Sequence, residues 1–328
     1  MLEAFDMEGR LMGTVHDLLQ ERGKRAVLDL DMDRRVVEAA AEYLADEENG
    51  LGFAYSGWAQ AALPHKRLAD DATWQLQTDR MILMVEPGRR PVRDAAPQWV
   101  GVPYGSRARL IMLYLQTEAL RTGSREVELG GSLRAWLTRM GISPGGKSMK
   151  DVKDQAERLS RCRLTFNMSG RGRAGLVNQN IVDSALFLDM EEEGQGSLFL
   201  DRARLSESFF AELQKHPVPL EEAAIRAINA HSMALDVYLW LAYRLHVLDK
   251  PRAVTWAALK AQFGTGFRQL KHFKGPFQDN LALALAVYPA AKVEVLEEGV
   301  VLHPSRPPVA VRQVSVGRVL TGTGASGR

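Results

Sequence analysis

The sequence has a single cysteine, Cys162, among its 328 residues. One cysteine cannot form a disulfide within the chain, and the seven scattered histidines do not complete a zinc site with it. The apolar runs, such as residues 281–286, are far shorter than the roughly 20 residues that span a bilayer. The first residues are acidic, whereas a secretory signal begins with basic residues. We therefore expect a cytoplasmic protein with no structural metal, no cofactor and no membrane segment.

Neither global disorder nor one small domain fits the composition. Apolar residues make up 46% of the chain and charged residues 25%, as in ordinary globular proteins. The length favours two domains at roughly 150 residues each. We predict an N-terminal segment over residues 1–95, partly flexible and packed on the first domain. The two domains then cover residues 96–205 and 206–308, and residues 309–328 form a flexible tail.

A large excess of one charge is also absent, since the net charge is only +2. The distribution is nevertheless uneven: residues 1–50 have 6 basic and 13 acidic side chains, residues 101–180 have 14 and 6, and residues 181–230 have 4 and 10. The chain is basic again after residue 231. Ordinary solvated surface charge would explain this pattern. Two separate surfaces that bind a polyanion would explain it equally well. The charge distribution alone leaves both interpretations open.

The order of elements after residue 100 is typical of a winged helix-turn-helix. Periodicity and turn residues predict an apolar helix (107–122), a strand (125–129), a helix opened by Ser132, a turn (141–146), a basic helix (148–162) capped by Ser148, and two strands (163–169 and 176–189) joined by a Gly- and Arg-rich loop. Before this unit, the sequence predicts a helix over 33–44, a loop over 49–58, a β-like segment over 73–85 and a Pro/Gly linker over 86–93.

The same order recurs in degenerate form, which indicates an internal duplication. The second copy has an apolar helix (235–248), a strand (252–256), a short helix (259–263), a basic helix from about residue 266, and a closing hairpin (292–297 and 300–303). Gly275-Pro276 should kink its basic helix, because proline removes a hydrogen bond and clashes with the preceding turn. The predicted fold class is α+β: two tandem winged helix-turn-helix domains, helix-rich, with small antiparallel β-hairpin wings.

Residues 141–148, Gly-Ile-Ser-Pro-Gly-Gly-Lys-Ser, satisfy the phosphate-loop pattern, and residues 185–189 resemble the strand that ends in a metal-binding aspartate. A phosphate loop follows a buried strand, however, whereas residues 132–140 have helical periodicity. The alternative is that Gly145-Gly146 forms the turn between two helices. An ATPase using this loop is the less favoured hypothesis, and no other catalytic constellation is evident, so we expect a non-enzymatic protein.

In a helix-turn-helix, the second helix enters the major groove and is called the recognition helix, while the wing contacts phosphates. The DNA-binding residues predicted on this basis are Lys147, Ser148, Lys150, Lys153, Arg158 and Arg161 on the first recognition helix, Arg171 and Arg173 on its wing, and Arg268, Gln269, Lys271, His272 and Lys274 on the second recognition helix. A solvated amphipathic helix without a DNA partner is the alternative for the first of these segments.

Several motifs together resemble the RepA family of bacterial plasmid replication initiators. They are Gly-Val-Pro-Tyr-Gly-Ser-Arg-Ala-Arg-Leu (101–110), Thr-Gly-Ser-Arg-Glu-Val-Glu-Leu (122–129), Gly-Lys-Ser (146–148), Gln-Ala-Glu-Arg-Leu-Ser-Arg-Cys-Arg-Leu-Thr-Phe (155–166), His-Pro-Val-Pro (216–219), Tyr-Leu-Trp-Leu-Ala-Tyr-Arg (238–244) and Val-Tyr-Pro (287–289). The resemblance implies binding to repeated double-stranded DNA sites in a plasmid origin, local duplex opening, recruitment of the host replicative helicase and a homodimeric form. A transcriptional repressor would share the DNA-binding chemistry and is the alternative.

Overall fold

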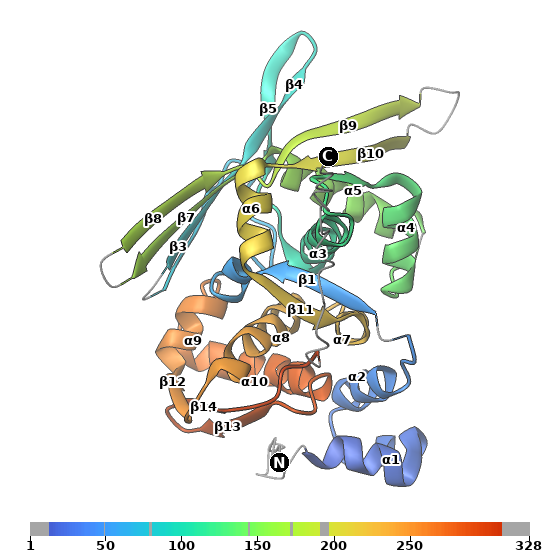
Figure 1. Cartoon of the computed structure of the whole chain (residues 1–328), viewed down its shortest axis with the longest axis vertical. Helices are drawn as coiled ribbons and strands as arrows, with labels where there is room; N and C mark the ends of the chain where they lie inside the picture. The colour runs from blue at the N-terminus through green and yellow to red at the C-terminus, as the bar shows by residue number, and fades with distance from the viewer. Residues whose placement is uncertain are drawn as a thin grey trace, which may run out of the picture.

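The structure combines helices with small antiparallel sheets (Figure 1), as the predicted α+β class requires. The structure is a computed structural model that describes residues 13–48, 50–78, 81–143, 145–170, 173–190 and 197–309. Apart from residue 309, the predicted C-terminal tail lies outside the described residues. No helix in the described part of the chain combines the length and the apolar character needed to cross a membrane.

Two units with the same order of elements form most of the structure. The first contains α3 (Gly105–Thr122), β6 (Glu126–Glu128), α4 (Gly130–Arg139), α5 (Gly146–Arg161), β9 (Val182–Met190) and β10 (Ser197–Leu205). The second contains α8 (Ser232–Arg244), β12 (Arg252–Thr255), α9 (Trp256–Phe263), α10 (Leu270–Ala286), β13 (Lys292–Leu296) and β14 (Gly299–His303). The strand orders, β6-β10-β9 and β12-β14-β13, are equivalent. The predicted duplication is therefore present in the fold.

The first unit has a hairpin inserted between α5 and its closing strands. β7 (Arg163–Gly170) and β8 (Arg173–Gln179) join β2 (Trp74–Gln77) and β3 (Met81–Glu86) in a separate sheet of order β2-β3-β7-β8. The prediction of one strand over 176–189 is wrong, because the chain passes from one sheet to the other after Gln179. The buried side chains of Leu164 and Phe166 explain the choice of sheet, since they lie opposite the buried Val85 and Leu83 of β3.

The N-terminal segment contacts both units, whereas the sequence placed it on the first. α1 (Gly13–Leu28) and α2 (Arg34–Leu44) lie against the second unit: His16 Nε2 is 2.8 Å from the carbonyl oxygen of Ala286, and Arg35 pairs with Asp279 at 3.5 Å. α2 matches the predicted helix and begins where Asp33 accepts a hydrogen bond from the Arg35 amide.

The loop predicted over residues 49–58 is β1 (Leu51–Tyr55) followed by a short 3₁₀ helix (Ser56–Ala59). β1 pairs with β11 (Pro217–Glu221), and the chain between the units is completed by α6 (Glu207–Lys215) and α7 (Glu222–Ala227). The side chains of Gln116 and Thr117 on α3 accept hydrogen bonds from backbone amides of β1. These long-range pairings turn a segment with loop-like composition into a strand.

The predicted linker over 86–93 is also structured. Residues Gly88–Val92 form β4, which pairs with β5 (Ala95–Gly101) in a two-stranded hairpin. Pro91 lies at an irregularity in the register between Arg90 and Val92, and a missing amide donor is tolerated at such a position.

The predicted kink in the second recognition helix does not break it: α10 is one helix that includes Pro276. The carbonyl that loses its partner belongs to His272, four residues earlier. Because His272 is exposed, water can donate to that carbonyl. The helix therefore continues through Pro276 without interruption.

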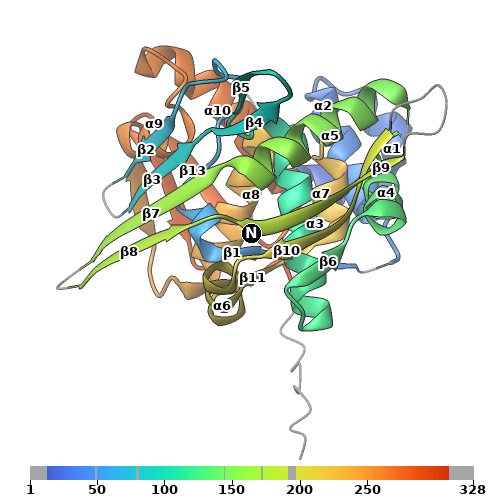
Figure 2. The same cartoon turned by 90° about the horizontal axis from the view of Figure 1, so that it is seen from above.

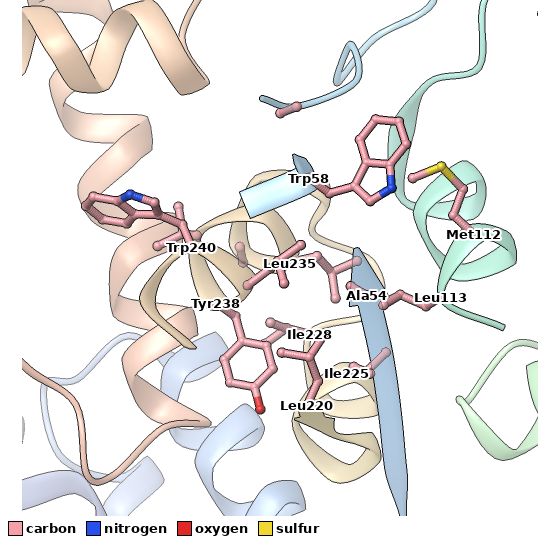
Figure 3. Packing of buried hydrophobic residues seen from close by; sticks show 14 of the residues in the cluster. Ala54, Trp58, Met112, Leu113, Leu220, Ile225, Ile228, Leu235, Tyr238 and Trp240 are labelled. Carbon is pink, nitrogen blue, oxygen red and sulfur yellow. The ribbon is translucent and has the colours of Figure 1, made fainter. Parts of the chain in front are cut away.

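The core lies where the two units meet. Figure 3 shows Ala54 of β1, Leu113 of α3, Leu220 of β11 and Leu235 of α8 converging in one apolar cluster. One buried ion pair crosses this core: Arg109 on α3 donates from Nε and Nη2 to the two carboxylate oxygens of Asp236 on α8, each at 2.6 Å. The first helices of the two units are thus joined by apolar contacts and by a charge pair.

His65 lies beside this ion pair, and its environment makes stability depend on pH. Burial and the nearby Arg109 guanidinium lower the pKa of His65 to about 4, against the opposing effect of Asp236. The unfolded chain, with an ordinary histidine pKa near 6.5, therefore binds more protons than the folded chain as the pH falls from 6.5 toward 4. Acidification through this range must destabilise the fold.

We expect the free energy of unfolding to fall by about 1 to 2 kcal/mol between pH 7 and pH 5 through His65. The lower figure allows for the 21% of its side chain that remains exposed. In His65→Asn, the free energy of unfolding should fall less between pH 7 and pH 5 than it does in the wild type. Chemical denaturation at the two pH values would measure both changes. Equal losses in the variant and the wild type would contradict this assignment.

Candidate nucleic-acid interface

The chain turns at Gly141, between the end of α4 and the start of α5. Gly141 has a φ of 74°, a left-handed conformation that glycine adopts without strain. Its amide donates to the Thr138 carbonyl, and the Ile142 amide donates to the Leu137 carbonyl. This pair of hydrogen bonds is a Schellman motif, which ends α4 and turns the chain.

The segment that resembles a phosphate loop lies after a helix, not after a strand. Its first glycine ends a helix instead of following a parallel strand. Residues 185–189 lie in β9, at the edge of an antiparallel sheet. Helix α5 begins at Gly146 with Gly145 as its N-cap, so Ser148 lies in its first turn and does not cap it. Ser132 is likewise inside α4, whose N-cap is Leu129.

The N-terminal half of α5 presents an open, charged face. Val152, Ala156 and Leu159 are buried, whereas Lys147 and Lys150 are exposed on the other side of the helix. Ser148 and Lys153 are half-buried beside them. The predicted contacts Lys147 and Lys150 therefore lie where a duplex could reach them.

Arg158 is a correction to the predicted site. Its side chain is only 3% exposed, and its Nε donates to Asp154 at 2.9 Å while Nη2 donates to Asp70 at 3.2 Å. The guanidinium also lies over the Tyr104 ring, 5.3 Å from its centre. These partners bury a side chain that helical spacing alone places near the surface. Arg158 therefore holds α5 to the protein and does not face solvent.

Arg161 is also engaged within the protein. Its Nε donates to Glu157 at 3.0 Å, and its Nη1 donates to the backbone carbonyl of Arg89 in β4 at 3.2 Å. The C-terminal turn of α5 thus supports the β4–β5 hairpin.

The predicted wing residue Arg173 lies on the β7–β8 hairpin, outside the sheet of the first unit. Arg173 is the first residue of β8 and pairs with Gly170 of β7, in the sheet that contains β2 and β3. Arg171 lies outside the described residues. In the strand order of the first unit, the closing hairpin is β9–β10. Two consecutive hairpins follow α5, and only long-range pairing distinguishes the one that joins the sheet of the first unit.

The second unit exposes a matching set of residues at the start of α10. Arg268 and Gln269 precede the helix, with Gln269 as its N-cap, and Lys271 and His272 lie in its first turn; all four are exposed. Lys274 differs, because its Nζ donates to the Glu297 carbonyl at 3.2 Å and lies 5.5 Å from the centre of the Trp256 ring. Lys274 thus links α10 to the β13–β14 hairpin.

Sequence reasoning missed the arginines of the β4–β5 hairpin. Arg89, Arg90 and Arg93 are exposed, as is Trp99 on the partner strand. The available signal was the basic cluster Gly-Arg-Arg-Pro-Val-Arg close to a tryptophan, which the Pro/Gly content caused us to interpret as a linker.

The family comparison matches residues 102–258 to the model described as plasmid-encoded RepA protein. This segment, a little under half of the chain, is similar to the RepA family of plasmid replication initiators. This RepA segment contains all of the first unit and continues into α9 of the second. The resemblance noted from the sequence motifs is thereby confirmed.

Among solved structures, selenomethionine derivatives of domains 2 and 3 of RctB are similar to this chain with a TM-score of 0.50 and 11% identity, covering 78% of this chain and 99% of that one. A second RctB structure, of domains 2–3, has a TM-score of 0.44 and 12% identity, covering 76% and 94%. At this identity the first likeness concerns the fold alone. No curated protein sequence matches the chain.

Proposed function

We propose that this protein is a non-enzymatic plasmid replication initiator that binds repeated double-stranded DNA sites at an origin. Each of its two units acts as a winged helix-turn-helix, with α5 and α10 as recognition helices and β9–β10 and β13–β14 as wings. The RepA segment supports the initiator role, and the repeated element order supports two DNA-binding units.

One observation carries the DNA-binding part of the proposal: equivalent helices of the two units both expose cations at their N-terminal ends. These are Lys147 and Lys150 at α5, and Arg268 and Lys271 at α10. Figure 2 shows both helices toward one edge of the molecule, with α6 at the opposite edge. Arginine and lysine at the start of a recognition helix donate to guanine edges and to phosphates.

The RepA family also suggests the later steps and partners. Once bound, the protein promotes opening of the adjacent duplex and recruits the host replicative helicase, and a homodimer controls its activity. The helix that ends before Gly141 and the helix that begins at Gly146 support a protein that performs these steps without hydrolysing ATP itself. Equilibrium dialysis with labelled ATP should therefore show no saturable binding.

Lys150→Ala and Arg158→Ala are expected to have different consequences. A duplex selected by the wild type from a randomised library serves as the probe, and binding is followed by fluorescence anisotropy. Lys150→Ala should reduce the preference for the selected duplex by about 1 to 3 kcal/mol if Lys150 contacts a base edge, with an unchanged melting temperature. Arg158→Ala should lower the melting temperature, because Asp70 and Asp154 lose a buried partner.

Lys215→Ala is the matched control, because Lys215 is an exposed cation on α6. Wild-type affinity should also fall with salt, at a slope near −0.9 for each phosphate neutralised. A wild-type protein whose duplex binding is absent or independent of salt would rule out the proposed function.

A further inference from the structure

The β4–β5 hairpin is an isolated ribbon that projects from the body near α5 (Figure 1). Neither of its strands pairs with another strand in the described part of the chain. An isolated two-stranded hairpin is marginally stable in water, so this one depends on its attachment. The attachment is to α5.

The base of the hairpin fits closely against the last turn of α5. Gly88 and Gly101 are paired across the two strands. A β-carbon at Gly88 would overlap the carbonyl oxygen of Arg161, and one at Gly101 would overlap the guanidinium of Arg158. Gly101 also has a φ of 85°. These two glycines allow the hairpin to approach the helix, where Arg161 donates to the Arg89 carbonyl and Arg158 donates to the Val102 carbonyl.

The hairpin occupies part of the outward face of α5. Lys147, Lys150 and Glu157 share this face, because their spacing follows the helical repeat. Arg90 Nη1 lies 3.3 Å from Glu157 Oε2, so the hairpin covers the C-terminal half of the face and leaves the half with the two lysines open. A duplex that contacts the two lysines must therefore pass beside the hairpin.

The exposed part of the hairpin carries more positive charge than its contacts neutralise. Arg90 is paired with Glu157. Of the other charged residues of the hairpin, Arg89 and Arg93 are basic and only Asp94, at the tip, is acidic. The Arg89 guanidinium lies 3.8 Å from the centre of the Trp99 ring, directly across the register, and Trp99 is 40% exposed. Stacking on a ring orients a guanidinium and leaves its edge donors available to an anion.

We propose that the β4–β5 hairpin clamps the phosphate backbone beside the bases read by α5, with Arg89 and Arg93 as phosphate ligands and Trp99 orienting Arg89. This inference rests on the proposed function, because it assigns a second contact to the same duplex. Phosphate contacts are independent of base sequence, so the hairpin contributes affinity and register, and α5 contributes base preference.

The double variant Arg89→Ala/Arg93→Ala tests the clamp by salt dependence. Each lost phosphate contact lowers the magnitude of the salt slope by about 0.9. Two losses should make the affinity ratio of wild type to variant shrink about tenfold between 50 mM and 200 mM salt. The selected duplex and a scrambled duplex should be weakened alike. The control Arg121→Ala/Lys215→Ala removes the same charge from two exposed side chains on α3 and α6 and should retain the wild-type slope.

A tethered cleavage reagent gives an independent test of position. The native Cys162 is fully buried, and burial raises the pKa of its thiol to about 12, so it should not react with the label. Arg93→Cys carrying an iron chelate should cut each strand of the selected duplex at a restricted position next to the patch protected by α5. Arg121→Cys with the same label should not cut the duplex locally.

The two proposals fail in different ways. If the wild type binds the selected duplex with a strong salt dependence, but the double variant keeps the same slope and labelled Arg93→Cys does not cut, the clamp is wrong and the DNA-binding function stands. If the wild type does not bind duplex DNA, the proposed function itself is wrong.

Discussion

Asp236→Ala is expected to lower the free energy of unfolding by about 3 to 5 kcal/mol, the cost typical of removing one partner from a buried ion pair. Asp236 and Arg109 are only 9% and 5% exposed and share two hydrogen bonds of 2.6 Å. The variant would leave the guanidinium buried without a counter-ion, although it would still donate to the carbonyls of Leu63 and Gly105.

Urea denaturation would measure this loss, and a double-mutant cycle with Arg109→Met would separate the pair energy from packing. Because a buried pair costs desolvation, the double variant Arg109→Met/Asp236→Leu should regain part of the stability lost in Asp236→Ala. Arg121→Ala, at an exposed ion pair on the same helix as Arg109, should change stability by less than about 1 kcal/mol. If Asp236→Ala also lowered the free energy of unfolding by less than about 1 kcal/mol, the core would tolerate the unpaired charge.

The ion pair also bears on DNA binding, because it joins α3 to α8 and so fixes one unit relative to the other. Two recognition helices held on one side of the molecule can lie in successive major grooves only if their half-sites are about one helical turn, ~10.5 bp, apart. One chain should then protect two patches of different sequence, since α5 and α10 present different side chains.

Inserting about 5 bp between those half-sites is expected to lower affinity by roughly 10²- to 10⁴-fold, the usual gain from linking two binding modules. The insertion turns one half-site to the opposite face of the duplex, where the second unit cannot reach it. Hydroxyl-radical footprinting of a verified monomer would locate the patches, and anisotropy would measure the affinities.

An insertion of about 10 bp returns both half-sites to the same face of the duplex but leaves them farther apart than in the original site. It should therefore recover part of the affinity. Lys271→Ala should weaken binding to the original duplex more than binding to the half-turn duplex, where α10 is already disengaged. A single protected patch, or a half-turn insertion without effect, would show that the second unit does not bind DNA as proposed.

The sequence by itself determined the features that depend on local signals. Apolar periodicity located α3, and its end at Gly123 matches a left-handed C-terminal residue. Helical periodicity before Gly141 predicted a helix where a phosphate loop would follow a buried strand, and the repeated order of elements predicted two units. The exposure of Lys150 and Lys271 also follows from helical spacing, because apolar neighbours take the buried face.

Only the tertiary structure decided which strands pair and which arginines are exposed. β7 and β8 join β3 in a separate sheet, and β4 pairs with β5 although its composition favours a linker. Arg158 is buried because Asp70, 88 residues away, lies beside it in the fold. These outcomes depend on partners distant in the chain, and helical or strand periodicity carries no information about such partners. The phosphate clamp proposed for Arg89 and Arg93 depends on the same long-range packing.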